Sequence, residues 1–128
     1  MFNYWAILVV SIIGYIIPMI WYSSALFGKE WLRLSKLKSM KPSGGVILVG
    51  FITTLIFNAV LALIVAYTGV DTFSQGMAVA FLVWIGFIAT TLMGSVLYNK
   101  SPVALYLINV TQYLISMLIA GGILAVWR

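Results

Sequence analysis

The 128-residue sequence contains no cysteine and no histidine. Without thiols the chain can form neither disulfides nor thiolate metal sites, and without imidazole it lacks the most common metal ligand and general base of proteins. Acidic side chains number only two, Glu30 and Asp71. We therefore expect no metal site, no cofactor and no catalytic residues.

Charge of either sign is scarce, at 7% of residues, whereas 64% of residues are hydrophobic. Four uncharged stretches are long enough to cross a bilayer as helices. They cover residues 4–27, 44–67, 75–98 and 103–127. The sequence predicts an all-α polytopic integral membrane protein, a four-transmembrane-helix bundle that forms a single domain over residues 1–128.

The basic residues predict the orientation of this bundle. Five of the seven lie between the first and second predicted spans, and Lys100 lies between the third and fourth. Loops rich in Lys and Arg remain in the cytoplasm. We expect the first and third loops to be cytoplasmic and both termini to lie outside. Because these cations flank membrane spans, we expect no nucleic-acid partner.

The first loop has the pattern of a short amphipathic helix in the headgroup layer. Phe27, Trp31 and Leu34 share one helical face, and basic side chains occupy the opposite face. Membrane lipids with anionic headgroups are the expected partners of this loop. The residues expected to contact the interface and the headgroups are Trp21, Trp31, Lys29, Arg33, Lys36, Lys38 and Lys41.

Polar residues inside the predicted spans are the main functional signal. An amide without a partner in hydrocarbon costs several kcal/mol, so Asn58, Asn109 and Gln112 should face the bundle interior. They predict either interhelical hydrogen bonds, including a homo-oligomer contact, or a polar pocket for a solute or a lipid headgroup. The candidate residues are Tyr22, Asn58, Trp84, Thr90, Asn109, Gln112, Tyr113 and Ser116. Pro18 is expected to kink the first helix.

Catalysis and proton-coupled transport lack the necessary groups. Glu30 and Asp71 are predicted on opposite membrane faces, so they cannot form an acid–base pair. The predicted spans contain no Asp, Glu, Lys, Arg or His, whereas proton-coupled carriers rely on such groups. Uniport and lipid binding require none of them.

Three segments carry a resemblance to a known family: IWYSSALFGKEW, FLVWIGFIATTLMGSVLY and LYLINVTQYLISMLIAGGILAVW. They resemble the small bacterial integral-membrane family catalogued as domain of unknown function seventeen sixty-one. The resemblance implies a four-helix protein of a bacterial cytoplasmic (inner) membrane and implies no activity. The positions that match the family pattern are Trp21, Tyr22, Phe27, Gly28, Lys29, Trp31, Trp84, Gly86, Phe87, Thr90 and Asn109. The family often has a proline where this chain has Ser24.

The sequence therefore predicts a non-enzymatic membrane protein that binds a lipid, a small amphiphile or a membrane partner through its polar helix faces. The alternative is a small-solute transporter or channel subunit. A homodimer or higher homo-oligomer is expected because the helices are short and rich in glycine.

Overall fold

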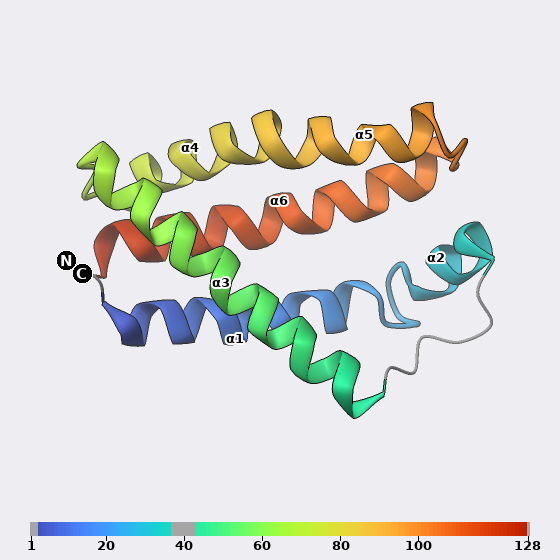
Figure 1. Ribbon diagram of the computed structural model, residues 1–128, viewed down its shortest axis with the longest axis horizontal. Coiled ribbons are helices and arrows are strands. Elements are labelled where there is room, and N and C mark those ends of the chain that lie inside the picture. The colour runs from blue at the N-terminus through green and yellow to red at the C-terminus, as the bar shows by residue number, and fades with distance from the viewer. Residues whose placement is uncertain (1–2, 37–42, 128) are drawn as a thin grey trace.

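The structure is a computed structural model that describes residues 3–36 and 43–127. Within these residues the chain is helical and contains no strand (Figure 1). The helices are α1 (Tyr4–Trp21), α2 (Gly28–Ser35), α3 (Gly44–Thr68), α4 (Phe73–Val83), the π-helical η1 (Trp84–Ala89), α5 (Thr90–Leu97) and α6 (Val103–Val126).

Four helices in the described part of the chain are long and apolar enough to cross a membrane. They are α1, α3, the continuous helix made by α4, η1 and α5, and α6. The prediction of an all-α four-helix bundle is confirmed. The predicted second, third and fourth spans agree with α3, Phe73–Leu97 and α6 to within two residues at each end.

Helix starts follow local capping chemistry at three of the spans. The Asn3 side-chain oxygen accepts the Trp5 and Ala6 N–H groups at 3.1 and 3.2 Å at the start of α1. The Ser43 hydroxyl accepts the Val46 N–H at 3.3 Å at the start of α3. The Thr72 hydroxyl accepts the Gln75 N–H at 3.2 Å at the start of α4. These bonds satisfy donors that have no partner within the helix.

The predicted first span was too long at its C-terminal end. Helix α1 ends at Trp21, and residues 22–27 form a tight turn before α2. The Phe27 N–H donates to the Trp21 carbonyl at 3.0 Å, which closes the turn. At Gly28 the backbone packs closely against the start of this turn. A Cβ there would clash with the Tyr22 carbonyl oxygen and lie 2.7 Å from the Ser23 carbonyl oxygen, so only glycine fits. The turn contains no charged residue, so an uncharged stretch in the sequence does not reveal where the helix ends.

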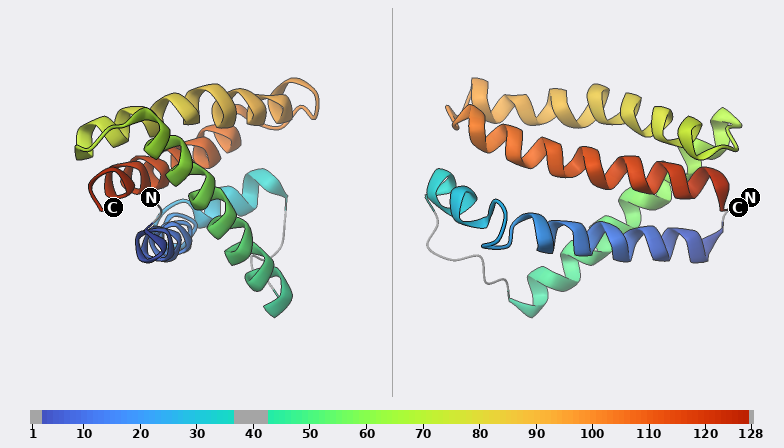
Figure 2. Two further views of the ribbon diagram at one scale, coloured as in Figure 1. Left: turned by 60° about the vertical axis from the view of Figure 1, so that its left-hand side comes forward. Right: turned by 180° about the vertical axis from the view of Figure 1, so that it is seen from behind.

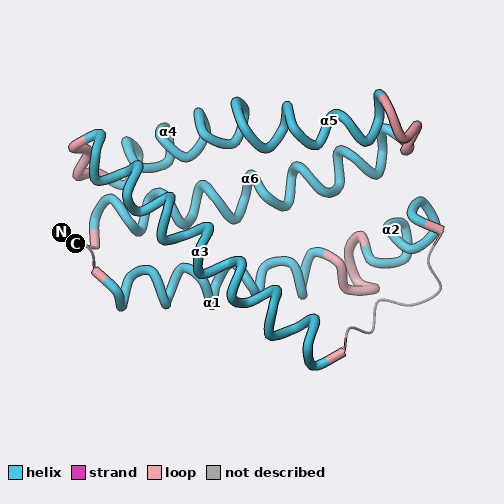
Figure 3. The backbone as a smooth tube through the Cα atoms, in the orientation of Figure 1, coloured by secondary structure: helices cyan, strands magenta, loops and turns pink. Residues whose placement is uncertain are grey.

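Helix α6 lies at the centre of the bundle. It contacts α1, α2 and α3 as well as all three parts of the Phe73–Leu97 helix. Figures 1 and 2 show α4–α5 along one side of α6, α1 along the other, and α3 crossing at a steep angle. The backbone trace in Figure 3 shows both chain ends at one end of the bundle, with α2 and the α5–α6 turn at the opposite end.

The closest helix contact joins α4 and α6 through glycine. A Cβ at Gly76 would clash with the Gly121 carbonyl oxygen and lie 2.6 Å from the Ala125 methyl. A Cβ at Gly121 would lie 2.6 Å from the Ala80 methyl. Gly76 and Ala80, like Gly121 and Ala125, are four residues apart, which is the small-xxx-small pattern of close helix packing in membranes.

Two backbone carbonyls of the π-helical segment η1, one near its middle and one at its C-terminal end, accept hydrogen bonds from hydroxyl groups. The Thr90 hydroxyl donates to the Gly86 carbonyl at 2.7 Å, and the Tyr106 hydroxyl of α6 donates to the Ala89 carbonyl at 2.6 Å. A π-turn shifts the regular α-helical ladder of carbonyl acceptors. These two hydroxyls therefore supply donors where the ladder changes.

Candidate functional site

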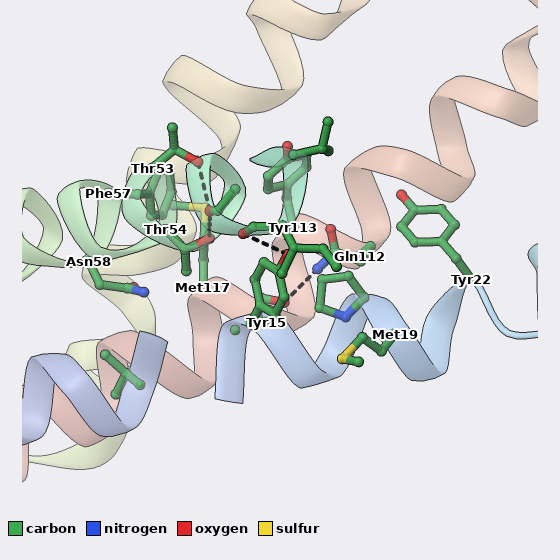
Figure 4. Close-up of a pocket in the computed structure, with 17 residues that line it drawn as sticks. Tyr15, Met19, Tyr22, Thr53, Thr54, Phe57, Asn58, Gln112, Tyr113 and Met117 are labelled. Carbon is green, nitrogen blue, oxygen red and sulfur yellow. Dashed lines mark hydrogen bonds between the residues drawn. The ribbon is translucent and has the colours of Figure 1, made fainter. Parts of the chain in front are cut away.

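A cavity of about 850 Å³ lies between α1, α3 and α6 (Figure 4). Five of the predicted pocket residues line it: Tyr22, Asn58, Gln112, Tyr113 and Ser116. Pro18 also lines it, and α1 continues through this proline to Trp21. The other predicted pocket residues, Trp84, Thr90 and Asn109, do not line it.

The cavity exists because α3 diverges from α1. The two helices meet where a Cβ at Gly14 would lie 3.6 Å from the Thr54 methyl and 3.8 Å from the Asn58 amide nitrogen. Toward its N-terminus α3 then moves away from the rest of the bundle (Figures 1 and 2). One side chain bridges the gap, because the Tyr15 hydroxyl donates to the Ile47 carbonyl at 3.1 Å.

Asn58, which lines the cavity, forms a buried polar pair with Ser11 of α1, which does not line it. The Asn58 amide donates to the Ser11 hydroxyl at 3.2 Å, and Ser11 donates to the Ile7 carbonyl at 2.7 Å. Asn58 is 4% exposed and Ser11 is fully buried. The prediction did not include Ser11 among the site residues. The sequence feature that could have identified Ser11 is its place, as a small polar residue, on the same helical face as Gly14 and Pro18.

The α6 wall supplies further polar groups. The Gln112 amide donates to the Ser116 hydroxyl at 2.8 Å, and Gln112 is 5% exposed. Tyr113 is 41% exposed, and its hydroxyl has no hydrogen-bond partner among the residues that the structure describes. Figure 4 shows Gln112 and Tyr113 between Asn58 at one end of the cavity and Tyr22 at the other.

Asn109 belongs to a second polar cluster beside the cavity. Its side-chain oxygen accepts the Tyr22 hydroxyl at 2.7 Å and the Trp31 indole N–H at 3.1 Å. The Trp21 indole N–H donates to the neighbouring Ile108 carbonyl at 3.0 Å. Both indole N–H groups therefore donate to groups of α6, and contact of Trp21 and Trp31 with the membrane interface stays a prediction. Inside the bundle, helix α6 provides the acceptors that an indole needs.

The remaining two predicted pocket residues also serve helix packing. The Trp84 indole N–H donates to the Val110 carbonyl at 2.8 Å, so η1 contacts the same part of α6 as Trp21 and Trp31. Thr90 is exposed, and its hydroxyl donates within its own helix, to the Gly86 carbonyl. We name the contacts of Trp21, Tyr22, Trp31 and Trp84 to Ile108, Asn109 and Val110 the aromatic cluster.

Helix α2 is amphipathic, as expected. Lys29, Arg33 and Lys36 are exposed, while Trp31 and Leu34 are half-buried. The inner face packs against α6. Arg33 pairs with Glu30 one turn earlier, and this hydrogen bond and the negative charge both raise the pKa of Arg33. Lys38 and Lys41, also predicted headgroup contacts, lie outside the described residues.

A family model described as "Protein of unknown function (DUF1761)" matches residues 5–125. The chain belongs to this family. No curated protein and no solved structure matches the chain. The DUF1761 positions singled out in the sequence include Trp21, Tyr22, Trp31, Trp84 and Asn109, and the structure brings these five together in the aromatic cluster.

Proposed function

We propose that the protein is a non-enzymatic integral membrane protein that binds one lipid or small amphiphile in the cavity between α1, α3 and α6. The cavity carries this proposal. Its volume of about 850 Å³ lies within the ~300–1,000 Å³ range of small-molecule sites. Its lining combines apolar side chains such as Val10 and Met117 with a few amides and hydroxyls, which is the usual composition of such sites.

Access from the bilayer supports an amphiphile over a water-soluble ligand. The α3 wall of the cavity includes Val46 and Ile47, which are 60% and 44% exposed. Side chains of this kind on a spanning helix face lipid. A ligand that already resides in the bilayer could therefore enter beside the N-terminal half of α3 without crossing a polar barrier.

Native mass spectrometry of the protein extracted in a mild detergent tests this proposal. We expect one defined lipid or amphiphile to remain bound to the unmodified protein. Ser116→Phe should remove it, because the larger side chain occupies the cavity. The control is Leu107→Phe, on an exposed position of the same helix that does not line the cavity. Equal occupancy in both variants would contradict binding in this cavity.

For the location we propose a bacterial cytoplasmic membrane, with the first and third loops inside and both termini outside. The distribution of basic residues supports this orientation. Cysteines at Asn99 and Ser74, two exposed positions in or beside the third and second loops, provide the test. An impermeant thiol reagent applied to intact cells should label Ser74→Cys and not Asn99→Cys. The reverse labelling would overturn the orientation.

The alternative function, a small-solute transporter or channel subunit, is less well supported. The part of the lining that α1 and the following turn supply begins at Val10, so it leaves out the first six residues of α1. Transport would therefore require a rearrangement that opens this end of the bundle. Flux of a solute panel into sealed vesicles containing folded protein would detect such activity. A homo-oligomer stays a prediction.

A further inference from the structure

Building on the proposed function, we infer that the cavity selects an uncharged amphiphile with a hydroxyl headgroup, such as an acylglycerol or a long-chain alcohol. The polar groups of the cavity can exchange hydrogen bonds with a hydroxyl, and they offer nothing that would compensate a charge. The inference concerns which ligand binds, whereas the proposed function concerns only whether an amphiphile binds there.

The exclusion of charge follows from the lining. No Asp, Glu, Lys, Arg or His is among the cavity-lining residues that the structure describes. The nearest described cations in sequence, Lys29, Lys36 and Arg33, are exposed in or at the end of α2, and Arg33 is paired with Glu30. An ion placed in an apolar environment without a counter-ion loses several kcal/mol of solvation. A phosphate or carboxylate headgroup is therefore disfavoured inside the cavity.

Side-chain acceptors in the cavity wall favour a hydrogen-bond donor on the ligand. Asn58 and Gln112 both line the cavity. Their amide nitrogens donate to Ser11 and Ser116, and neither side-chain oxygen accepts a hydrogen bond from a residue that the structure describes. A ligand hydroxyl can supply the donor that these oxygens lack.

Donors in the α6 wall favour an acceptor on the same ligand. The Tyr113 hydroxyl has no partner among the described residues. The Ser116 hydroxyl accepts the Gln112 amide, and its own proton has no acceptor within the part of the chain that the structure describes. A hydroxyl group both donates and accepts, so one headgroup can match an amide oxygen of the lining and these donors together.

Competition between matched ligands tests the selectivity. We expect monooleoylglycerol to bind at least ~30-fold more tightly than lysophosphatidic acid with the same oleoyl chain, because the two differ only by a charged phosphate. Oleyl alcohol should bind about 5-fold more tightly than methyl oleate, which lacks the donor. Native mass spectrometry with equal concentrations of the paired ligands measures both ratios. Equal binding within either pair would overturn the inference.

A positive charge added at the cavity mouth should weaken this selectivity. Met19 lines the cavity and is 64% exposed, so Met19→Lys can keep its ammonium near the interface while its stem stays on the helix. We expect this variant to gain binding of lysophosphatidic acid by about tenfold. The matched control is Ile20→Lys, on an equally exposed neighbour outside the cavity, which should leave the ratio unchanged.

The outcomes separate this inference from the proposed function. If neither the uncharged nor the anionic amphiphile binds, the proposed function fails and the inference fails with it. If lysophosphatidic acid and monooleoylglycerol bind equally and Ser116→Phe abolishes both, the cavity binds amphiphiles and only the hydroxyl selectivity is wrong. If Met19→Lys and Ile20→Lys change the ratio equally, charge acts through the membrane surface, and the cavity does not provide the selectivity.

Discussion

Helix α6 packs in opposite ways on its two flanks. Toward α4 it presents Gly121 and Ala125 to Gly76 and Ala80, so closely that a single added methyl group would overlap the facing backbone. Toward α1 and α3 it faces a cavity of about 850 Å³. The same helix therefore forms the tightest contact of the described bundle on one flank and the wall of its candidate binding site on the other.

The difference shows how this small membrane protein combines stability with a cavity. In lipid, apolar surface alone does not drive helices together, so close backbone contact and interhelical hydrogen bonds must do so. The α4 flank relies on close contact. The α1 flank relies on hydrogen bonds from aromatic side chains, which hold α1 and α2 to α6 at Ile108 and Asn109 and leave space further along the helix.

The largest effect should come from adding a methyl group on the glycine flank. Gly76→Ala forces the backbones of α4 and α6 apart, because its Cβ would overlap the Gly121 carbonyl. We expect a loss of about 3 kcal/mol in the free energy of unfolding, measured by denaturant titration in detergent micelles. Gly94→Ala, where the added Cβ meets only the Tyr98 ring at 3.9 Å, should be neutral or stabilising. Equal losses would show that the contact is not tight.

The next largest effect should come from the aromatic cluster. Asn109→Leu removes the acceptor of the Tyr22 hydroxyl and of the Trp31 indole at once. Leaving two donors without a partner should cost about 2 kcal/mol in the free energy of unfolding. Because Trp31 belongs to α2, hydrogen exchange should also become faster in the α2 amides than in those of α4. If α2 remains protected, Asn109 does not hold it.

Much of the fold could be predicted from the sequence, because a long uncharged stretch has few alternatives to a spanning helix. The end of α1 could not, since the turn over residues 22–27 is as free of charged residues as the helix before it. The Gly76–Gly121 contact also escaped prediction. The sequence contains several stripes of small residues, and nothing in one chain says which stripe meets another.

The candidate site could be predicted in part for the same reason. The cost of an amide in hydrocarbon correctly placed Asn58, Asn109 and Gln112 inside the bundle, and all three are hydrogen-bonded there. It could not show that Asn109 lies in a different cluster from the other two. That separation depends on the direction in which α3 diverges, which is a property of helix packing and is not a property of any single residue.

Gln112→Leu should lower the stability less than Asn109→Leu does, and it should lower ligand binding more. Gln112→Leu removes a hydrogen bond within α6 and leaves no described donor of another helix without a partner. We expect the free energy of unfolding to fall by at most about 1 kcal/mol, while occupancy of the cavity by monooleoylglycerol falls several-fold. Unfolding titration and native mass spectrometry on the same sample measure both. A stability loss as large as that of Asn109→Leu would mean that Gln112 serves helix packing.

The smallest effect should come from the face of the Phe73–Leu97 helix that contacts neither flank of α6. Thr90 is exposed and donates only within its own helix, so Thr90→Ala should change the free energy of unfolding by less than about 0.5 kcal/mol in the isolated chain. Thr90 and its neighbours Gly86 and Gly94 form a stripe of small residues along this helix, as Gly76 and Ala80 do on the packed face of α4.

A second copy of the chain packed on this stripe would make the stability loss of Thr90→Ala depend on protein concentration, because the oligomer and the folded state would then be coupled. If the loss does not depend on protein concentration, no second copy packs on this stripe. The contact of α4 with α6 is then the only role of small residues in this helix that the described structure supports.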